Sequence, residues 1–274
     1  MISVQNLTKS YGDNLILSQI NLDIKEGEFV SIIGPSGSGK STLINIMAGL
    51  DKASSGKVLM DGKEVKDTDT DRMMVFQSPA LFPWLSVYDN VASGLKNICK
   101  DKEEIYERVS TILKKVYLLK YKDYYPHQLS GGMKQRVALA RSMVMNPKVL
   151  LMDEPFSALD EQTRILLHSE LQQIWMETKK TIIFVTHNLR EAIKLSTRVV
   201  ILGTRPGTIV EEMSIELGYP RVIENSDLFS MEKALYGKLK VEMEKVVKEE
   251  LGNEYNFEKS NISDKYNNTM GGGI

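Results

Sequence analysis

The sequence is short of cysteine, of long apolar runs and of net charge, and each shortage excludes a class of protein. Cys99 is the only cysteine among the 274 residues, so there is no internal disulfide framework and a reducing compartment is expected. No apolar run approaches the ~20 residues that a membrane-spanning helix needs, and Met1 to Lys9 contain no signal-peptide core. The 35 basic and 36 acidic side chains give a net charge of −1, which argues against nucleic-acid binding as the main function.

Within an otherwise ordinary globular composition, one glycine-rich segment stands out. Residues 34–42 read Gly-Pro-Ser-Gly-Ser-Gly-Lys-Ser-Thr, which fits the phosphate-binding pattern G-x-x-x-x-G-K-S. An apolar run at 29–33 precedes it and a helix-compatible stretch at 42–48 follows it, as a P-loop requires. The loop N–H groups would cradle an anion, Lys40 would reach the β- and γ-phosphates, and Ser41 would ligate Mg²⁺. The alternative is a turn that binds nothing.

Two acidic residues follow a predicted buried strand. Residues 148–152 form a continuous apolar run of the kind found in parallel sheets, and Asp153 and Glu154 come directly after it. Asp153 is suited to hold the Mg²⁺ shell at the carboxyl end of the strand, and Glu154 to polarise a water that attacks the γ-phosphate. Alone, the pair would equally well just end a strand; beside a P-loop, the catalytic interpretation is favoured.

A second possible phosphate site lies at another predicted helix start. Ser130 is a natural N-cap, and Gly131 and Gly132 leave the N-terminus of the following helix bare. The site lies 90 residues after Lys40 (130 − 40), and an ordinary capped helix is the alternative. A second phosphate-binding helix end in one chain is hard to explain unless two chains share nucleotides.

The remaining pattern predicts an α/β fold. Residues 1–33 alternate short apolar runs with turns and predict a strand-rich N-terminal layer, and residues 56–66 predict a hairpin that turns at Asp61-Gly62. Residues 181–185 predict a second buried strand, and residues 198–217 predict two strands around Arg205-Pro-Gly207. The predicted helices are residues 101–118, 161–177 and 229–251.

Together these motifs resemble the nucleotide-binding subunit of an ATP-binding cassette (ABC) transporter over about residues 2–217. In chain order they are the P-loop, Gln77, the Leu-Ser-Gly-Gly signature from Leu129, the acidic strand end, Ser157-Ala-Leu-Asp160, and His187. The resemblance implies a P-loop NTPase fold of the α/β class, with a RecA-like core, an N-terminal antiparallel β layer and a helical subdomain. It also implies two head-to-tail copies that sandwich two ATP molecules with Mg²⁺.

The resemblance assigns roles residue by residue. Tyr11 would stack on the adenine, Gln77 would join the Mg²⁺ shell and sense a membrane partner, and His187 would contact the γ-phosphate beside the general base Glu154. Ser130, Gly131 and Gly132 would cap the γ-phosphate of the other protomer, and Asp160 would couple the two sites. The implied catalytic residues are Glu154, His187 and Gln77; the metal ligands are Ser41, Gln77 and Asp153; the ATP-binding residues are Tyr11, Gly34, Pro35, Ser36, Gly37, Ser38, Gly39, Lys40, Ser41 and Thr42.

Some of these residues also fit a purely structural role, and one departs from the family pattern. Tyr11, Gln77 and His187 would each fit an ordinary structural position, and His127 and His168 have no context beyond one. Met133 stands where glutamine is commonest in the family, and it cannot donate a hydrogen bond. The capping atoms belong to Ser130 and the glycines, so hydrolysis is not threatened.

The segment after Gln77 indicates a branch of the family. Residues 79–91, together with Leu-Ser-Gly-Gly-Met from Leu129 and Thr204-Arg-Pro-Gly207, resemble the nitrate/sulfonate/taurine importer branch. The resemblance implies a peripheral subunit at the cytoplasmic face of the cell membrane, with transmembrane permease subunits and an extracytoplasmic solute-binding protein as partners. The apolar residues that sit where the family docks a coupling helix, with internal packing as the alternative, are Leu81, Phe82, Trp84 and Leu85.

We therefore predict an ABC ATPase domain over residues 1–217, with a helical subdomain inserted at about 84–145. A helical extension over 218–254 and a disordered tail over 255–274, rich in Asn, Lys, Ser and Gly, would follow. One alternative is a soluble ABC ATPase that acts on a non-membrane partner. A P-loop kinase or GTPase is a weaker alternative, because it does not explain the Leu-Ser-Gly-Gly signature.

Overall fold

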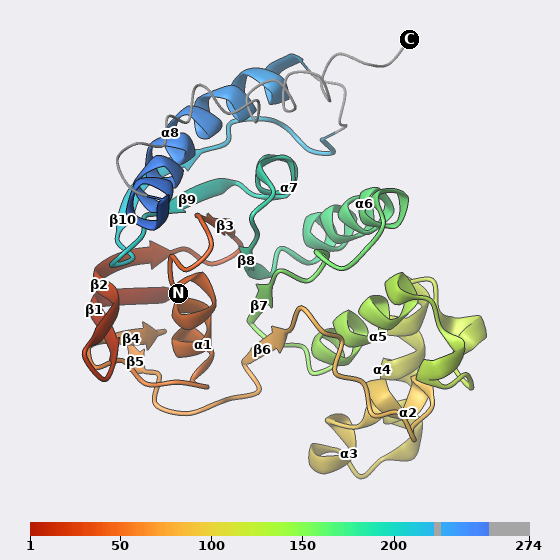
Figure 1. The fold of residues 1–274 in the computed structure, drawn as a ribbon. Helices are drawn as coiled ribbons and strands as arrows, with labels where there is room; N and C mark the ends of the chain where they lie inside the picture. The colour runs from red at the N-terminus through yellow and green to blue at the C-terminus, as the bar shows by residue number, and fades with distance from the viewer. Residues whose placement is uncertain (222–225, 252–274) are drawn as a thin grey trace.

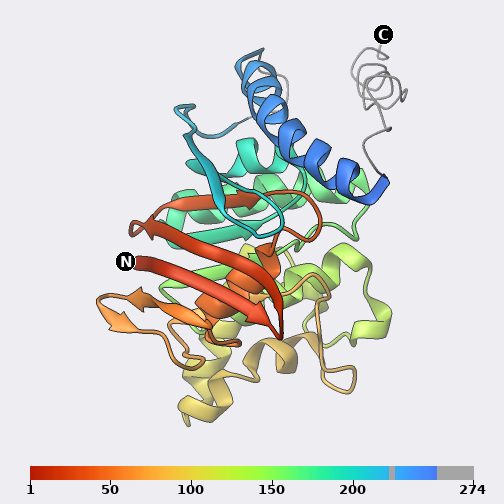
Figure 2. The same cartoon turned by 60° about the vertical axis from the view of Figure 1, so that its left-hand side comes forward.

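The computed structural model describes residues 1–221 and 226–251, and their strands form two sheets (Figure 1). An antiparallel sheet in the order β2-β1-β4-β5 lies at the front in Figure 2. A second sheet has the order β10-β9-β3-β8-β7-β6. The first sheet contains β1 (Ile2–Tyr11), β2 (Asn14–Ile24), β4 (Ser55–Met60) and β5 (Lys63–Glu64); the second contains β3 (Phe29–Ile33), β6 (Arg72–Val75), β7 (Val149–Asp153), β8 (Thr181–Val185), β9 (Arg198–Leu202) and β10 (Ile209–Ser214).

The second sheet is parallel except for β10, which pairs antiparallel with β9. Its four central strands, β9, β3, β8 and β7, are buried on both faces, as the continuous apolar runs predict, whereas the edge strands β6 and β10 are partly exposed. On β7, Val149 and Leu151 face α1 (Lys40–Ala48) and the antiparallel sheet, whereas Leu150 and Met152 face α6 (Glu161–Thr178). Trp175, on α6, is buried with its ring centroid 6.0 Å from that of Phe29 on β3.

A lobe of helices is inserted between the neighbouring strands β6 and β7 (Figure 1). Asp101 caps α4 by accepting hydrogen bonds from the N–H groups of Glu103 and Glu104. Ile105 and Val109 on α4 are buried, as the predicted apolar face requires. The lobe consists of α2 (Val87–Ala92), α3 (Leu95–Ile98), α4 (Lys102–Lys115), α5 (Gly131–Met143) and two short 3₁₀ turns, η1 (Leu119–Tyr121) and η2 (Pro126–Gln128).

Two helices cover the other end of the parallel sheet. The terminal helix α8 (Ser226–Leu251) packs Leu235 and Leu239 against α7 (Leu189–Leu195) and β9. It begins three residues before the predicted start at 229. The predicted tail, residues 255–274, lies outside the described residues.

Two sequence predictions need correction. Within residues 1–33, only β1 and β2, up to Ile24, belong to the antiparallel layer, which β4 and β5 complete; β3 pairs with β8 and β9 in the parallel sheet instead. The helix predicted over 101–118 ends at Lys115, where Val116 leaves helical geometry. Among the described residues, we find no helix with the length and apolarity to span a membrane.

Candidate nucleotide-binding and catalytic site

The loop from Gly34 to Gly39 joins β3 to α1 at the carboxyl end of the parallel strands. Gly39 precedes α1 with φ of 87°, a left-handed conformation that glycine adopts easily, and no side chain caps this helix end. The first N–H groups of α1 thus have no capping partner among the described residues and carry the positive end of the helix dipole. This helix start can therefore bind an anion.

The Lys40 ammonium folds back into this loop. Its Nζ donates to the carbonyl oxygens of Gly34 and Pro35, at 2.9 Å each, and the side chain is buried. Burial lowers the pKa of Lys40, and the charges of Glu154 and Asp153 partly oppose that shift. A phosphate would be a stronger partner for this cation than two carbonyls.

Ser41 and Asp153 meet at the start of α1. Ser41 Oγ donates to Asp153 Oδ1 at 3.1 Å. Burial raises the pKa of Asp153; the charge of Glu154 also raises it, and the Ser41 hydrogen bond and Lys40 lower it. A hydroxyl and a carboxylate are oxygen ligands that suit Mg²⁺, and a cation would offset the burial of the carboxylate. In the described part of the chain no three Asp, Glu, His or Cys side chains converge on a metal site, so phosphate and water oxygens would complete the shell.

Glu154 and His187 come from the ends of adjacent strands, β7 and β8. His187 Nδ1 lies 3.0 Å from Glu154 Oε2, and the Glu154 N–H donates to the carbonyl of Val185. Glu154 has φ of 43°, a conformation that non-glycine residues rarely adopt and that is concentrated at functional sites. The imidazole is 64% exposed, so its second ring nitrogen can reach a ligand.

Gln77 reaches this pair through a residue for which the sequence suggested no separate role. Gln77 Nε2 donates to Ser157 Oγ at 3.0 Å, and Ser157 Oγ donates to the carbonyl of Glu154 at 3.0 Å. The segment after β6 is thereby linked to the backbone of the candidate base. The only sequence signal for Ser157 was its place in Ser157-Ala-Leu-Asp160.

A buried network supports the turn that carries His187. Thr186 Oγ1 donates to Glu191 Oε2 at 2.5 Å and accepts from the N–H of Asn188 at 3.0 Å. Glu191 also lies 3.1 Å from His168 Nε2 and 3.7 Å from Arg164 Nε. His168 is thus part of the support beneath the site, in line with the structural role predicted for it. His127 stacks on Tyr125 instead.

Tyr11 lies beside the far end of the P-loop. Its hydroxyl donates to the carboxylate of Asp51, and Lys9 Nζ lies 4.5 Å from the ring centroid. The hydrogen bond to Asp51, burial and the charge of Asp51 raise the pKa of Tyr11, and an interaction with the Thr42 side chain lowers it. The ring is 52% exposed, as a platform for a base needs to be. Nothing in the sequence pointed to Asp51.

The signature residues lie in the helical lobe, at the start of α5 (Figure 1). Ser130 Oγ accepts from the N–H of Met133 at 3.3 Å and so caps its own helix. A Cβ on Gly132 would lie 2.3 Å from Thr163 Cγ2, so α5 and α6 need glycine here to approach each other. Asp160 caps α6 by accepting from the N–H of Thr163 at 2.9 Å, and this bond lowers the pKa of Asp160. Gly132 and Asp160 thus have local structural roles that the sequence did not predict.

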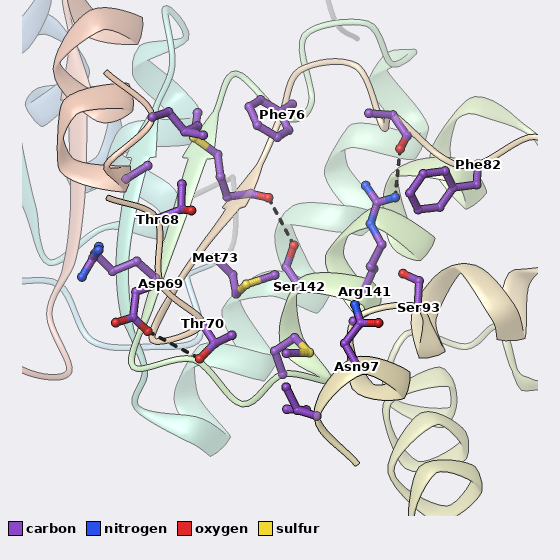
Figure 3. A pocket seen from close by; sticks show the side chains of 18 residues that line it. Thr68, Asp69, Thr70, Met73, Phe76, Phe82, Ser93, Asn97, Arg141 and Ser142 are labelled. Atoms are coloured by element: carbon purple, nitrogen blue, oxygen red, sulfur yellow. Dashed lines mark hydrogen bonds between the residues drawn. The ribbon is translucent and has the colours of Figure 1, made fainter. Parts of the chain in front are cut away.

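A groove of about 630 Å³ opens between the helical lobe and the parallel sheet (Figure 3). Arg141 points toward the Phe82 ring and donates to the carbonyl of Ala80 at 2.9 Å. Phe82 and Trp84 are in ring contact and are exposed, Trp84 by 71%, whereas Leu81 is half-buried and packs against the lobe core. Internal packing, the alternative for the 81–85 segment, is therefore correct for Leu81.

Comparison with known proteins identifies the family. The ABC transporter family model matches residues 17–157. The nitrate import ATP-binding protein NrtD of Synechocystis is 48% identical over 206 residues, covering 75% of this chain and 77% of the relative. The aliphatic sulfonates import ATP-binding protein SsuB of Bacillus cereus is 44% identical over 222 residues, covering 81% of this chain and 87% of the relative. The dimeric post-hydrolysis structure of the ATP-binding cassette MJ0796 bound to ADP and Pi matches with a TM-score of 0.70 and 36% identity, covering 80% of this chain and all of that one.

The chain belongs to the ABC transporter family and is an ATP-binding subunit of that family of ATPases. Its relatives belong to the branch that contains the nitrate and sulfonate import proteins. The weaker alternative, a kinase or GTPase, is thereby excluded.

Proposed function

We propose that this chain is the ATP-hydrolysing subunit of an importer that takes up a small solute, of the nitrate, sulfonate or taurine kind, through a separate membrane permease. One observation carries the proposal. Lys40, Ser41, Asp153, Glu154 and His187 come from three separate parts of the sequence and meet at the carboxyl ends of β3, β7 and β8. The names of the nitrate and sulfonate import relatives support the proposed direction of transport and class of solute.

In the proposed mechanism the chain's own residues bind and orient ATP. The phosphates lie over the open N–H groups of α1, and Lys40 exchanges the carbonyls of Gly34 and Pro35 for phosphate oxygens. Ser41, Asp153 and Gln77 would hold Mg²⁺, which would neutralise charge on the phosphates. The Tyr11 ring would pack on the adenine.

Glu154 is the proposed general base. It accepts a proton from the water that attacks the γ-phosphorus, while the bond to the leaving oxygen of ADP breaks. The carboxylate contact at Nδ1 orients the His187 ring and leaves its other nitrogen for the γ-phosphate and the attacking water. The Ser157 bridge from Gln77 to the Glu154 carbonyl would carry the state of the docking segment to the base.

The proposed active unit is a head-to-tail dimer with two ATP molecules. Ser130 and Gly131 lie at an exposed helix start in the helical lobe, where a partner's γ-phosphate would bind. Support comes from the dimeric cassette bound to ADP and Pi. Asp160, one turn from the Gly132–Thr163 contact, would link the two sites.

The permease is proposed to dock on the groove beside Phe82 and Trp84, which puts the subunit at the cytoplasmic face of the membrane with a solute-binding protein acting from outside. Exposed aromatic side chains beside a groove are typical anchors for a helix. Arg141 holds the groove wall by donating to two carbonyl oxygens, those of Pro79 and Ala80.

The test is co-purification from detergent-solubilised membranes of the source organism, followed by mass spectrometry. We expect a multi-spanning permease and a solute-binding protein with the unaltered chain, and loss of both with Phe82→Ala/Trp84→Ala while ATP binding is kept. Tyr117→Ala is the control, because Tyr117 is a comparably exposed aromatic of the helical lobe. Recovery of soluble partners alone would favour the second candidate, an ABC ATPase that acts on a non-membrane partner.

A further inference from the structure

The Thr204-Arg-Pro-Gly207 motif has no part in the chemistry above, yet its Gly207 packs against the backbone of the P-loop. The motif forms the loop between β9 and β10, which is closed by a hydrogen bond from the N–H of Gly203 to the carbonyl of Thr208 at 2.8 Å. The loop therefore has a defined shape of its own.

One side of this loop supports the nucleotide site. The N–H of Gly207 donates to the carbonyl of Ile16 at 2.8 Å, and the N–H of Ser18 donates to the carbonyl of Gly207 at 2.9 Å. The loop is therefore joined to β2. A Cβ on Gly207 would lie 2.3 Å from the carbonyl oxygen of Ser38, which is fully buried within the P-loop. The backbone at Gly207 is thus in contact with the P-loop backbone, with no side chain between them.

The other side of the loop is held by α8. The Glu242 carboxylate is buried, and its Oε2 accepts from the N–H of Thr204 at 3.4 Å. A Cβ on Gly203 would lie 2.8 Å from the same oxygen and 2.8 Å from Val210 Cγ2, so a side chain here would push the carboxylate out of its present position. Lys245, on the same helix, pairs with the other oxygen, Oε1. A buried carboxylate is costly unless it is paired, so its contacts with the loop and with Lys245 fix its position.

The position of α8 is itself set by apolar packing. Leu235 and Leu239 pack with Ile193 and Ile201 under the helix, and α8 runs along the β9–β10 edge of the sheet (Figure 1). Lys238 pairs with Glu211 on β10 in the same region. The chain of contacts therefore runs from the sheet edge through Glu242 to the loop and from the loop to the P-loop.

We propose that α8 acts as a brace for the nucleotide site, in which Glu242 is a positioning residue that holds the 203–208 loop against the P-loop. Nucleotide affinity then depends on the docking of a helix that does not touch the nucleotide. The inference rests on the proposed nucleotide site at Lys40.

The test compares Glu242→Leu with Glu242→Gln in the full chain, by calorimetric titration with Mg-ATP. Leucine removes the acceptor, and we expect affinity to fall by about two- to thirtyfold, the range by which remote positions modulate binding. Glutamine keeps an oxygen acceptor for Thr204 and should retain most of the affinity. Turnover at saturating ATP should stay unchanged, and amide exchange at Ser38 and its neighbours should accelerate in the leucine variant.

Controls separate this role from a loss of general stability. Leu113→Ala removes a buried side chain from the helical lobe and should lower the melting temperature with no change in affinity. Val241→Ala changes an exposed neighbour on α8 and should change neither. If Glu242→Leu does not fold, Gly203→Ala provides the second route, because its Cβ would displace the carboxylate.

The outcomes are distinguishable from failure of the nucleotide site itself. If Lys40→Ala binds Mg-ATP normally, the P-loop assignment is wrong. If Lys40→Ala loses binding while Glu242→Leu and Gly203→Ala bind and exchange like the unaltered chain, only the brace is overturned.

Discussion

Two helix starts in this molecule have phosphate-binding sequences, and the structure makes them unequal. The start of α1 has no side-chain cap and gathers Lys40, Ser41 and Asp153 around it. The start of α5 is capped by its own Ser130 and is followed by the apolar Met133. The first combines uncapped N–H groups with a lysine and a hydroxyl, as the proposed phosphate site requires, whereas at the second the Ser130 hydroxyl already serves as the helix cap. In the proposed dimer, the second end would complete a site whose lysine and metal ligands belong to the other chain.

The largest expected effect comes from removing the cation of the first site. Lys40→Ala should weaken ATP binding at least about a hundredfold and abolish hydrolysis, because a buried charge-assisted contact to phosphate is lost. Calorimetric titration measures it, with exposed Lys52→Ala as the control. If Lys40→Ala bound ATP with unchanged affinity, the start of α1 would owe nothing to its lysine, and the contrast between the two helix starts would fail.

Glu154→Gln should sharpen the comparison, because it should keep ATP binding and nearly stop ATP hydrolysis. Loss of the base should reduce hydrolysis by about 10²- to 10⁴-fold. With hydrolysis blocked, ATP-Mg²⁺ should produce a stable dimer in size-exclusion chromatography with light scattering. A folded Glu154→Gln protein that stays monomeric in saturating ATP would contradict the shared-nucleotide model.

Adding Ser130→Arg to Glu154→Gln provides the control for the second helix end. Arginine at this exposed position should block the partner's approach and leave each chain monomeric. The ATP affinity of the monomer should not change, because the phosphate site at the start of α1 has its lysine, Lys40, in the same chain and does not use Ser130 of that chain.

A smaller effect is expected from Gly132→Ala, with Gly131→Ala as the matched control. At Gly132 the new Cβ would lie 2.3 Å from Thr163 Cγ2, whereas at Gly131 it would meet Leu159 at an ordinary 3.5 Å. We expect Gly132→Ala to destabilise the fold by roughly 1–3 kcal/mol and Gly131→Ala to have little effect. Urea unfolding of both variants without nucleotide checks this. Equal stability would show that Gly132 is not needed for packing.

The smallest effect concerns the stability of the chain without nucleotide. Burial raises the pKa of Asp153 above the value of 3.8, so the folded state holds its proton more tightly than the unfolded state does. Stability is therefore lost as the pH rises through the raised pKa. Asp153→Asn should be more stable at pH 7 by at most about 1 kcal/mol, since part of the charge is screened by water. The advantage should shrink as the pH falls toward 3.8. An advantage that grows on acidification would refute this.

Motifs in which neighbouring residues act together could be predicted from the sequence. The strand before Gly34, the strand that ends at Asp153, and the cap at Ser130 all lie where periodicity and cap chemistry placed them. These features depend on local backbone geometry, which short stretches of sequence determine.

Contacts between distant segments could not be predicted. Ser157 bridges Gln77 and Glu154, and Glu191 binds Thr186 and His168, because chain segments meet only after folding. The close approach of Gly132 to Thr163 depends on how two helices cross. No spacing in the sequence encodes these distances.

The uneven exposure of the two tryptophans gives the chain its own pair of optical reporters. Trp84 is 71% exposed beside the groove, whereas Trp175 is 5% exposed on the buried face of α6. Emission from Trp84 should shift to shorter wavelength when a partner covers the groove, and emission from Trp175 should change only when the core opens. A Trp175→Phe chain would therefore report partner docking, and a Trp84→Phe chain would report unfolding, with no attached dye.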